Sequence, residues 1–227
     1  MIDEFSMIFP CEENRLPLFL KTLSKYSEHG LPENYEIIVV SRTIKKFFIQ
    51  GMNIKLVNYE YEGEHFNPAM ALNIGVRNAT YKNIIISCPE VMPISNVLQQ
   101  LSNQVRGNYV CQVFDLNQDG TRRASLVNSS YRQMIGMYFL ACMRKEDIEK
   151  INGWDEDFMG GYCFEDNDFD SRWKRANIPF SIKDGIIGEH QFHPRFGESP
   201  GWSRNKLLFE ENNRKGIIRP KNGLVKE

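Results

Sequence analysis

The chain has 227 residues, and its 28 Lys and Arg against 29 Asp and Glu give a formal net charge of -1. Apolar residues make up 41% and charged residues 25%, and the mean hydropathy is -0.44. This composition is typical of a globular protein and excludes a disordered or collagen-like chain. The balanced charge gives no reason to expect a nucleic-acid partner. The length suits one large domain, and we expect residues 1–227 to form it.

Segments that would direct the chain to or across a membrane are not predicted. No run approaches the ~18 consecutive apolar residues that a membrane-spanning helix needs. The first four residues are acidic where a secretory signal is basic, and the five cysteines are scattered without CxxC spacing. These features predict a cytoplasmic protein without disulfides or structural zinc, and they leave peripheral contact with a membrane surface open.

Strand and helix patterns alternate through the first ninety residues. Short apolar runs bounded by turn residues predict strands, and apolar residues at helical spacing predict helices. Strands are expected at residues 5–9, 35–40, 54–57 and 84–86, and helices at residues 16–26 and 67–79. This order predicts an α/β fold with a mainly parallel sheet and helices on both faces.

The second half of the chain is less regular. We expect helices at residues 97–105 and 145–150, and strands at residues 109–114, 137–142 and 186–187. Residues 115–130 are polar and are predicted to form a loop. Residues 201–227 carry seven basic and three acidic residues and are expected to form a basic, solvated C-terminal tail.

A further helix is expected to begin near Asp166. It would bury Phe169 and Trp173, which recur at helical spacing. The same spacing pairs Asp168 with Arg172 and Asp170 with Lys174 across one helical turn, and both ion pairs are expected on the exposed side.

In open parallel sheets, ligands bind beyond the carboxyl ends of the strands. The fourth predicted strand ends at Ser87-Cys88-Pro89-Glu90, which places a carboxylate at a tight turn just past a buried strand. Glu90 is either a solvated turn residue or a ligand for a divalent cation that carries a nucleotide diphosphate. Hard cations prefer carboxylate oxygens, which favours the second interpretation.

The segment from Glu146 to Asp170 holds ten acidic residues and one basic residue, a local net charge of -9. Its last acids, Glu165 and Asp166, stand at the start of the predicted helix, where the helix dipole favours ionised carboxylates. Helix capping would explain one or two acids, but not the preceding glycines and the turn at Trp154, which we expect to be exposed. A general base requires an ionised carboxylate held by a rigid element beside a cleft.

Several segments, in one order along the chain, resemble family 2 glycosyltransferases of the GT-A fold. The segments that resemble the family's nucleotide-binding half are residues 5–13, 35–41 and 67–79. Residues 138–158 resemble its acceptor-side segment. Gly160-Gly161 followed by Glu165-Asp166 resembles the Gly-Gly-Glu-Asp element of galactosyl- and N-acetylhexosaminyl-transferases.

The resemblance implies a GT-A, Rossmann-like mixed sheet, with a nucleotide-sugar half at about 1–93 and an acceptor half at about 94–200. Asp166 would be the general base, and Glu165 would hold sugar hydroxyls. The implied donor-binding residues are Pro10, Cys11, Glu12, Ser41, His65, Arg77 and Cys88. The implied acceptor contacts are Trp154 and Gly161.

The resemblance also implies a metal site of Mn²⁺ or Mg²⁺. The family's Asp-x-Asp corresponds to Cys88-Pro89-Glu90, so Glu90 keeps the second carboxylate while Cys88 replaces the first. A later histidine often completes the family's metal shell, and here His190 is the first candidate and His193 the second. Imidazole and carboxylate ligands together suit Mn²⁺-like ions. Ser41-Arg42 stands where the family usually has an acidic pair, which departs from its pattern for recognising the base.

We therefore expect an inverting, metal-assisted hexosyl- or N-acetylhexosaminyl-transferase of polysaccharide biosynthesis. It would move a sugar from a nucleotide-diphosphate donor, UDP-linked by preference, to a hydroxyl of a carbohydrate or glycoconjugate acceptor. Two alternatives stay open. Cys88 in place of a carboxylate is compatible with a nucleotide-sugar binding protein that has lost turnover. A sugar-phosphate nucleotidyltransferase fits less well, because Pro10-Cys11-Glu12-Glu13 lacks the glycines of a phosphate-binding loop.

Overall fold

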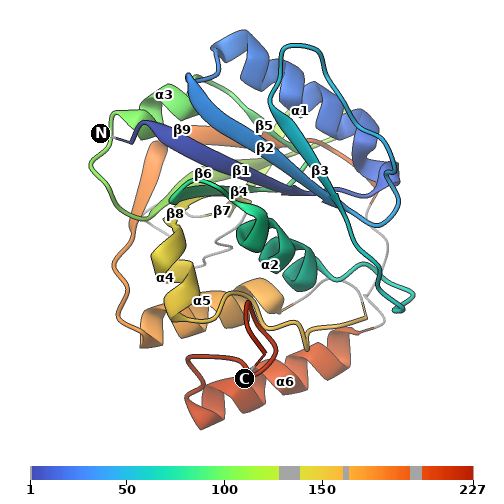
Figure 1. The fold of residues 1–227 in the computed structure, drawn as a ribbon, viewed down its shortest axis with the longest axis vertical. Helices are drawn as coiled ribbons and strands as arrows, with labels where there is room; N and C mark the ends of the chain where they lie inside the picture. Colours follow the sequence, from blue (N-terminus) through green and yellow to red (C-terminus); the bar gives the residue numbers. More distant parts are fainter. Residues whose placement is uncertain (1, 128–138, 161–163, 195–200, 227) are drawn as a thin grey trace.

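Short runs of apolar residues build one mixed sheet (Figure 1). The structure is a computed structural model that describes residues 2–127, 139–160, 164–194 and 201–226. The strand order is β3-β2-β1-β4-β8-β6-β9-β5, and β7 pairs with β6 outside this path. The predicted α/β fold is confirmed.

The first four strands of the chain are parallel to one another. They are β1 (Glu4–Pro10), β2 (Asn34–Ser41), β3 (Ile54–Asn58) and β4 (Asn83–Ser87). The centres of β1, β2 and β4 are fully buried, as expected for parallel strands that are covered on both faces. Their carboxyl ends therefore lie along one edge of the sheet.

The remaining strands make the sheet mixed. They are β5 (Val91–Pro93), β6 (Tyr109–Leu116), β7 (Arg122–Val127), β8 (Leu140–Arg144) and β9 (Ser181–His190). Strand β8 runs antiparallel to both β4 and β6, whereas β6 and β9 are parallel. Strand β5 is antiparallel to β9.

The predicted loop at residues 115–130 is wrong where the structure describes it. Asp115 and Leu116 extend β6, and residues 122–127 form β7 after a turn at Gly120, whose φ is 83°. The N–H of Gly120 donates to the carbonyl of Asn117, which closes the hairpin. Among the described strands β7 pairs with β6, and its residues Arg122 and Arg123 are exposed, so hydropathy does not reveal it.

Helices cover both faces of the sheet, as predicted (Figure 1). On one face lie α1 (Leu16–His29), which follows a short 3₁₀ turn at Glu13–Arg15, and α3 (Val97–Ser102). On the other lie α2 (Pro68–Asn78), α4 (Lys145–Lys150) and α5 (Glu165–Arg175). No helix in the described ranges is long and apolar enough to cross a membrane.

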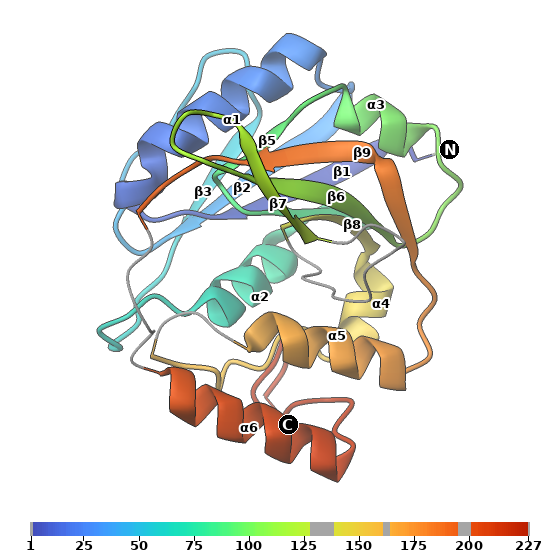
Figure 2. The same ribbon diagram turned by 180° about the vertical axis from the view of Figure 1, so that it is seen from behind.

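The predicted solvated tail is also wrong, because residues Trp202–Lys215 form helix α6. Both views show α6 beside α5, on the side away from the sheet (Figures 1 and 2). Asn212 attaches it by donating to Asp155 at 3.1 Å and to Asp168 at 3.0 Å. Phe164 also packs on the rings of Trp202 and Phe209 in α6. The buried residues of this helix, Asn205 and Asn212, are polar, so its sequence lacks the usual apolar stripe.

Gly75 allows α2 to approach β1 closely. A Cβ added at Gly75 would lie 2.3 Å from Cγ2 of Ile8, which is fully buried. We expect Gly75→Ala to lower the free energy of unfolding by about 1–3 kcal/mol, as overpacking does, although alanine favours helix more than glycine. Denaturant titration measures this.

Gly185→Ala is the matched control. An added Cβ there meets no atom within 4 Å among the described residues, and the stability should change by less than about 0.5 kcal/mol. Equal stability of the two variants would contradict the close packing of α2 on β1.

Candidate functional site

The register of three neighbouring strands brings the predicted metal ligands together. Asp115 of β6 is paired with His190 of β9, and His190 is paired with Val91 of β5. Glu90 directly precedes Val91, and its carbonyl accepts from the N–H of Gln191 at 3.0 Å. Residues that are far apart in sequence therefore meet at the carboxyl ends of β4, β6 and β9.

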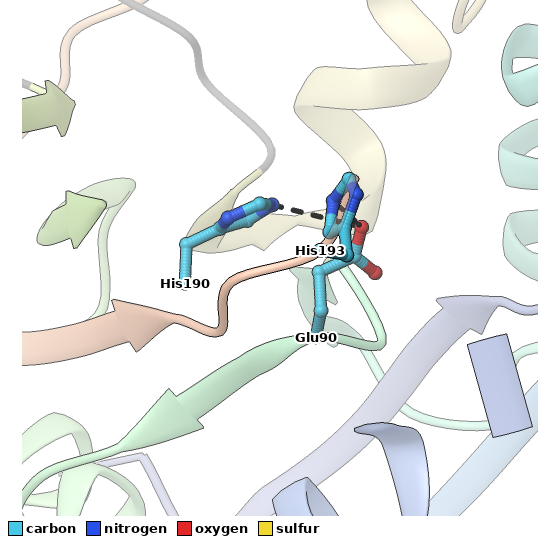
Figure 3. Close-up of side chains that lie close together, drawn as sticks. All are labelled: Glu90, His190 and His193. Atoms are coloured by element: carbon cyan, nitrogen blue, oxygen red, sulfur yellow. Dashed lines mark ion pairs between the residues drawn. The ribbon is translucent and has the colours of Figure 1, made fainter. Parts of the chain in front are cut away.

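Glu90, His190 and His193 point toward one another (Figure 3). Oε1 of Glu90 lies 3.6 Å from Nε2 of His190 and 3.3 Å from Nε2 of His193. One ligand atom from each residue lies within 4.8 Å of the others. This spacing and the mixture of one carboxylate with two imidazoles suit a divalent cation of the Mn²⁺ type.

Glu90 is held ionised although it is buried. Desolvation opposes its charge, but the adjacent side chains of His190 and His193 and the nearby guanidinium of Arg15 outweigh it and hold the pKa of Glu90 well below its ordinary value. Nε of Arg15 lies 4.0 Å from Oε1 of Glu90. Oε2 of Glu90 is buried and has no hydrogen-bond partner among the described residues. A buried, charged oxygen of this kind fits the ligand set of a cation.

Gln191 anchors the chain between the two histidines. Its side-chain amide donates to the carbonyls of Leu18 and Glu90 and to the hydroxyl of Thr22. These bonds tie the end of β9 to α1 and to the turn that carries Glu90. The position of His193 is therefore set by buried polar contacts and not by a strand or helix.

A cavity of about 220 Å³ opens beside the two histidines. The residues that line it are Asp115, Leu116, Arg123, His190, Phe192 and His193. Phe192 and Arg123 are exposed, whereas Asp115 is buried. The cavity thus offers an aromatic face and charged groups next to the cluster.

The acidic pair lies at the start of α5. Glu165 is buried, and the N–H of Asn167 donates to Oδ1 of Asp166 at 2.7 Å. Desolvation nevertheless raises the pKa of Asp166 to about 6. Phe164, directly before them, has a φ of 68° and packs at 5.6 Å on the rings of both Trp202 and Phe209 in α6.

Cys88 is close to both the cluster and the acidic pair. Desolvation raises the pKa of its thiol well above the ordinary value, and the negative charges of Glu90, Asp166 and Glu165 raise it further. These charges act on one thiol, so the acidic pair and the cluster belong to the same edge of the sheet. The thiol stays protonated at neutral pH, and Cys88 adds no charge where the GT-A family has a carboxylate.

Several of the predicted donor-binding residues lie at the ends of β1 and β2, where Glu12 pairs with Arg42. Glu12 accepts from the backbone N–H of Arg42 at 2.9 Å and from its Nε at 3.3 Å. Pro10 is partly exposed beside them, but the side chains of Cys11 and Ser41 are fully buried. Neither side chain reaches the surface in this structure, and the contact of these two residues with a donor stays a prediction. Oγ of Ser41 instead accepts from the backbone of the following turn.

Two further predictions need correction, and one lies outside the described residues. Arg77 is in the last turn of α2, at the edge opposite Glu90, where it donates to the carbonyls of Gly223 and Leu224. It does not approach a diphosphate at the strand ends. Trp154 is fully buried rather than exposed and stacks on Phe169 at 4.1 Å, so it does not contact an acceptor. Gly161 lies outside the described residues.

The positions of His65 and Trp173 are compatible with their predictions. His65 precedes α2, with Nε2 at 3.9 Å from Glu64, and its donor contact stays a prediction. Trp173 is fully buried, as expected.

The site contains charged residues that the sequence reasoning missed, namely Arg15, Asp115 and Arg123. Asp115 stands at the carboxyl end of β6, so the rule that identified Glu90 would have found it if the strand had been predicted to its end. The two arginines come from a 3₁₀ turn and from β7, neither of which was predicted.

Comparison with protein families gives one partial match. A family model described as the N-terminal domain of galactosyltransferase matches residues 122–193, which include Asp166, His190 and His193. No curated protein matches the chain in sequence.

Solved structures match most of the chain. S. aureus TarS 1–349 in complex with UDP has a TM-score of 0.68 at 14% identity over 99% of this chain and 67% of that chain. The mannosyltransferase PcManGT from Pyrobaculum calidifontis, in complex with GDP-Man and Mn²⁺, has a TM-score of 0.60 at 16% identity over 98% of this chain and 67% of that chain.

Another structure of S. aureus TarS 1–349 matches with a TM-score of 0.64 at 14% identity over 83% of this chain, which spans only 60% of that chain. These likenesses show the fold, which is the GT-A glycosyltransferase fold. They agree with the resemblance to family 2 glycosyltransferases that the sequence shows.

Proposed function

We propose that this chain is an inverting, metal-assisted glycosyltransferase that uses a nucleotide-diphosphate sugar, UDP-linked by preference. The observation that carries the proposal is the convergence of Glu90, His190 and His193 at the carboxyl edge of a GT-A sheet, where Glu165 and Asp166 are close to the same Cys88 thiol as Glu90. The partial galactosyltransferase match and the similar structures with UDP and with GDP-Man and Mn²⁺ support it.

Glu90, His190 and His193 would hold Mn²⁺ or Mg²⁺. A bound cation supplies positive charge that offsets the negative charge developing on the leaving diphosphate. Arg15, which faces Glu90, contributes further positive charge at the same end of the sheet. The buried, unpartnered Oε2 of Glu90 gives the ligand set an oxygen that the described protein groups do not satisfy.

Asp166 would act as the general base. It takes the proton of an acceptor hydroxyl as that oxygen attacks the anomeric carbon of the donor, which inverts the configuration there. Its pKa of about 6 supports this role, because a base works best when its pKa lies near the working pH. Glu165, one residue away and buried, would hold a sugar hydroxyl.

The transferred sugar would be a hexose or an N-acetylhexosamine, and the acceptor a carbohydrate or glycoconjugate. We propose that residues up to about 93 form the donor half, in which Pro10, Glu12 and His65 border the nucleotide. Residues from about 94 to 200 would form the acceptor half, which contains the acidic pair.

Calorimetric titration with UDP and GDP, each with and without Mn²⁺, tests this function. Metal-dependent binding of one nucleotide would support it and identify the nucleotide of the donor. Binding that ignores the metal would shift charge neutralisation to Arg and Lys side chains. Binding of a nucleotide sugar without transfer to any acceptor would favour a binding protein that has lost turnover.

Loss of an outer-sphere partner weakens metal binding about 10–100-fold. Glu90→Gln should weaken Mn²⁺ binding by more than this, because it removes the one carboxylate of the ligand set that the described residues form. Titration of Mn²⁺ in the presence of saturating UDP measures the change. Glu13→Gln, an exposed carboxylate in the same part of the sheet edge, is the control and should leave the affinity unchanged. Equal Mn²⁺ affinity of Glu90→Gln and the unmodified protein would contradict the ligand assignment.

A further inference from the structure

Asp115 contacts the candidate metal ligand His190 from the side away from Glu90. Its Oδ1 lies 3.2 Å from Nδ1 of His190, and the parallel register of β6 and β9 sets the two residues side by side. Its Oδ2 lies 3.5 Å from Nη1 of Arg123 on β7. Asp115 is 4% exposed, so its charge is neutralised by these neighbours rather than by bulk water.

The ring of His190 is held from both sides. Nδ1 faces Asp115, while Nε2 faces Glu90 at 3.6 Å. In a neutral imidazole one nitrogen carries the proton and the other is free to bind a metal, and the hydrogen bond made by one determines the role of the other. A proton on Nδ1, donated to Asp115, leaves the lone pair of Nε2 directed at the cluster.

The Nδ1 atom of His193, unlike that of His190, does not face a carboxylate among the described residues. Its Nδ1 lies 3.0 Å from the carbonyl of Pro194, in a local contact next to it in the chain. A carboxylate that accepts from a metal-bound imidazole raises the basicity of the ring and fixes its orientation more strongly than a neutral carbonyl does. The two histidines are therefore unequal, and His190 is the one that a second strand prepares.

We propose that Asp115 is a positioning residue of this site, which holds His190 in the tautomer that presents Nε2 to a divalent cation, with Arg123 balancing the charge of Asp115. The proposal rests on the proposed metal-assisted function and assigns to β6 and β7 a part in it. These two strands form a hairpin beside the cavity, so the hairpin serves the metal site as well as lining that cavity.

The test is the Mn²⁺ affinity of Asp115→Asn and Asp115→Ala, measured by calorimetry on the full chain with saturating UDP. The dissociation constant should rise about 10–100-fold, more for Ala than for Asn, because Asn keeps a weaker acceptor. At saturating Mn²⁺ the turnover should recover, which a merely structural defect would not allow.

Glu189→Gln is the matched control. It removes a carboxylate next to His190 in the chain, one that pairs with Arg122 at 2.9 Å. Its Mn²⁺ affinity should stay within twofold of the unmodified protein. Unchanged affinity in both Asp115 variants would overturn the proposal and leave the proposed function intact.

Long-range ¹H–¹⁵N NMR of the metal-free protein, at a pH where imidazoles are neutral, provides a readout that does not depend on metal. His190 should carry its proton on Nδ1 in the unmodified protein and lose this preference in Asp115→Ala. If the unmodified chain binds no Mn²⁺, the metal-assisted function fails, and this measurement then decides whether Asp115 orients His190. A proton on Nε2 of His190 in the unmodified protein would overturn the proposal.

Discussion

Asp166→Asn is expected to lower the rate of glycosyl transfer by about 10²–10⁴-fold, the contribution typical of a general base. The amide has nearly the same size but does not accept the proton of the attacking hydroxyl. UDP binding should stay nearly unchanged, because the proposed nucleotide and metal ligands lie near the ends of β1, β4 and β9. Initial rates with a nucleotide sugar and calorimetry with UDP measure the two quantities separately.

The pH dependence follows from the same carboxylate. Desolvation raises its pKa to about 6, and the charge of Asp170 contributes. A base works only when it is ionised, so the rate should rise with pH through about 6 and then level off.

Asp170→Asn is the matched control on the same helix. It removes one nearby negative charge, so turnover should remain and the rise should move to slightly lower pH. An equal loss of transfer and nucleotide binding in Asp166→Asn would contradict the assignment of Asp166 as the base.

Arg172→Met should lower the free energy of unfolding by about 3–5 kcal/mol, because it leaves a buried charge without its partner. Arg172 and Asp168 are both fully buried, with Nε of Arg172 at 2.6 Å from Oδ2 of Asp168. Nη1 of Arg172 also donates to the carbonyls of Ile151 and Gly153, at 2.9 and 2.8 Å. The substitution therefore removes the donor to Oδ2 of Asp168 and to two carbonyls, and only Oδ1 of Asp168 keeps its bond from Asn212. Thermal and denaturant unfolding measure the loss.

The other ion pair of α5 is the matched control. Lys174 and Asp170 have the same i,i+4 spacing, but the Lys174 side chain is 46% exposed. In the Lys174→Met variant, water can solvate Asp170 in place of the lost ammonium group. The free energy of unfolding should therefore fall by at most about 1 kcal/mol. The double variant Asp168→Asn with Arg172→Met should lose less stability than the two single variants added together, because neither charge is left alone. Equal costs of Arg172→Met and Lys174→Met would contradict the burial of the first pair.

The parallel strands of the fold could be predicted from the local pattern of apolar residues. The strands around Ile8, Ile38 and Ile85 are continuous apolar runs because both their faces are covered, and each predicted centre lies within the observed strand. Glu90 follows a predicted strand, whereas the resemblance to family 2 glycosyltransferases implies His190 and His193, which come after the strand predicted at residues 186–187. The rule that strand ends carry ligands needs only strand limits, and these were close to correct.

Side chains that depend on a partner far along the chain were predicted less well. Trp154 was expected to be exposed, but Phe169 stacks on it. Arg77 was placed near the donor, but it binds carbonyls of the C-terminal segment. Neither partner can be recognised from the residues beside them, because the contacts close only when the whole chain has folded.

The two ion pairs of α5 show most clearly which features depend on local sequence and which depend on tertiary packing. Spacing alone predicts both Asp168 with Arg172 and Asp170 with Lys174, since residues four apart share one face of a helix. Which pair meets water depends on α6, whose Asn212 covers Asp168. Asp115 likewise became part of the site through the register of β6 with β9. Helical and strand periodicity are local properties of the chain. Burial and strand register depend instead on which distant segments pack against each helix or strand in the tertiary structure.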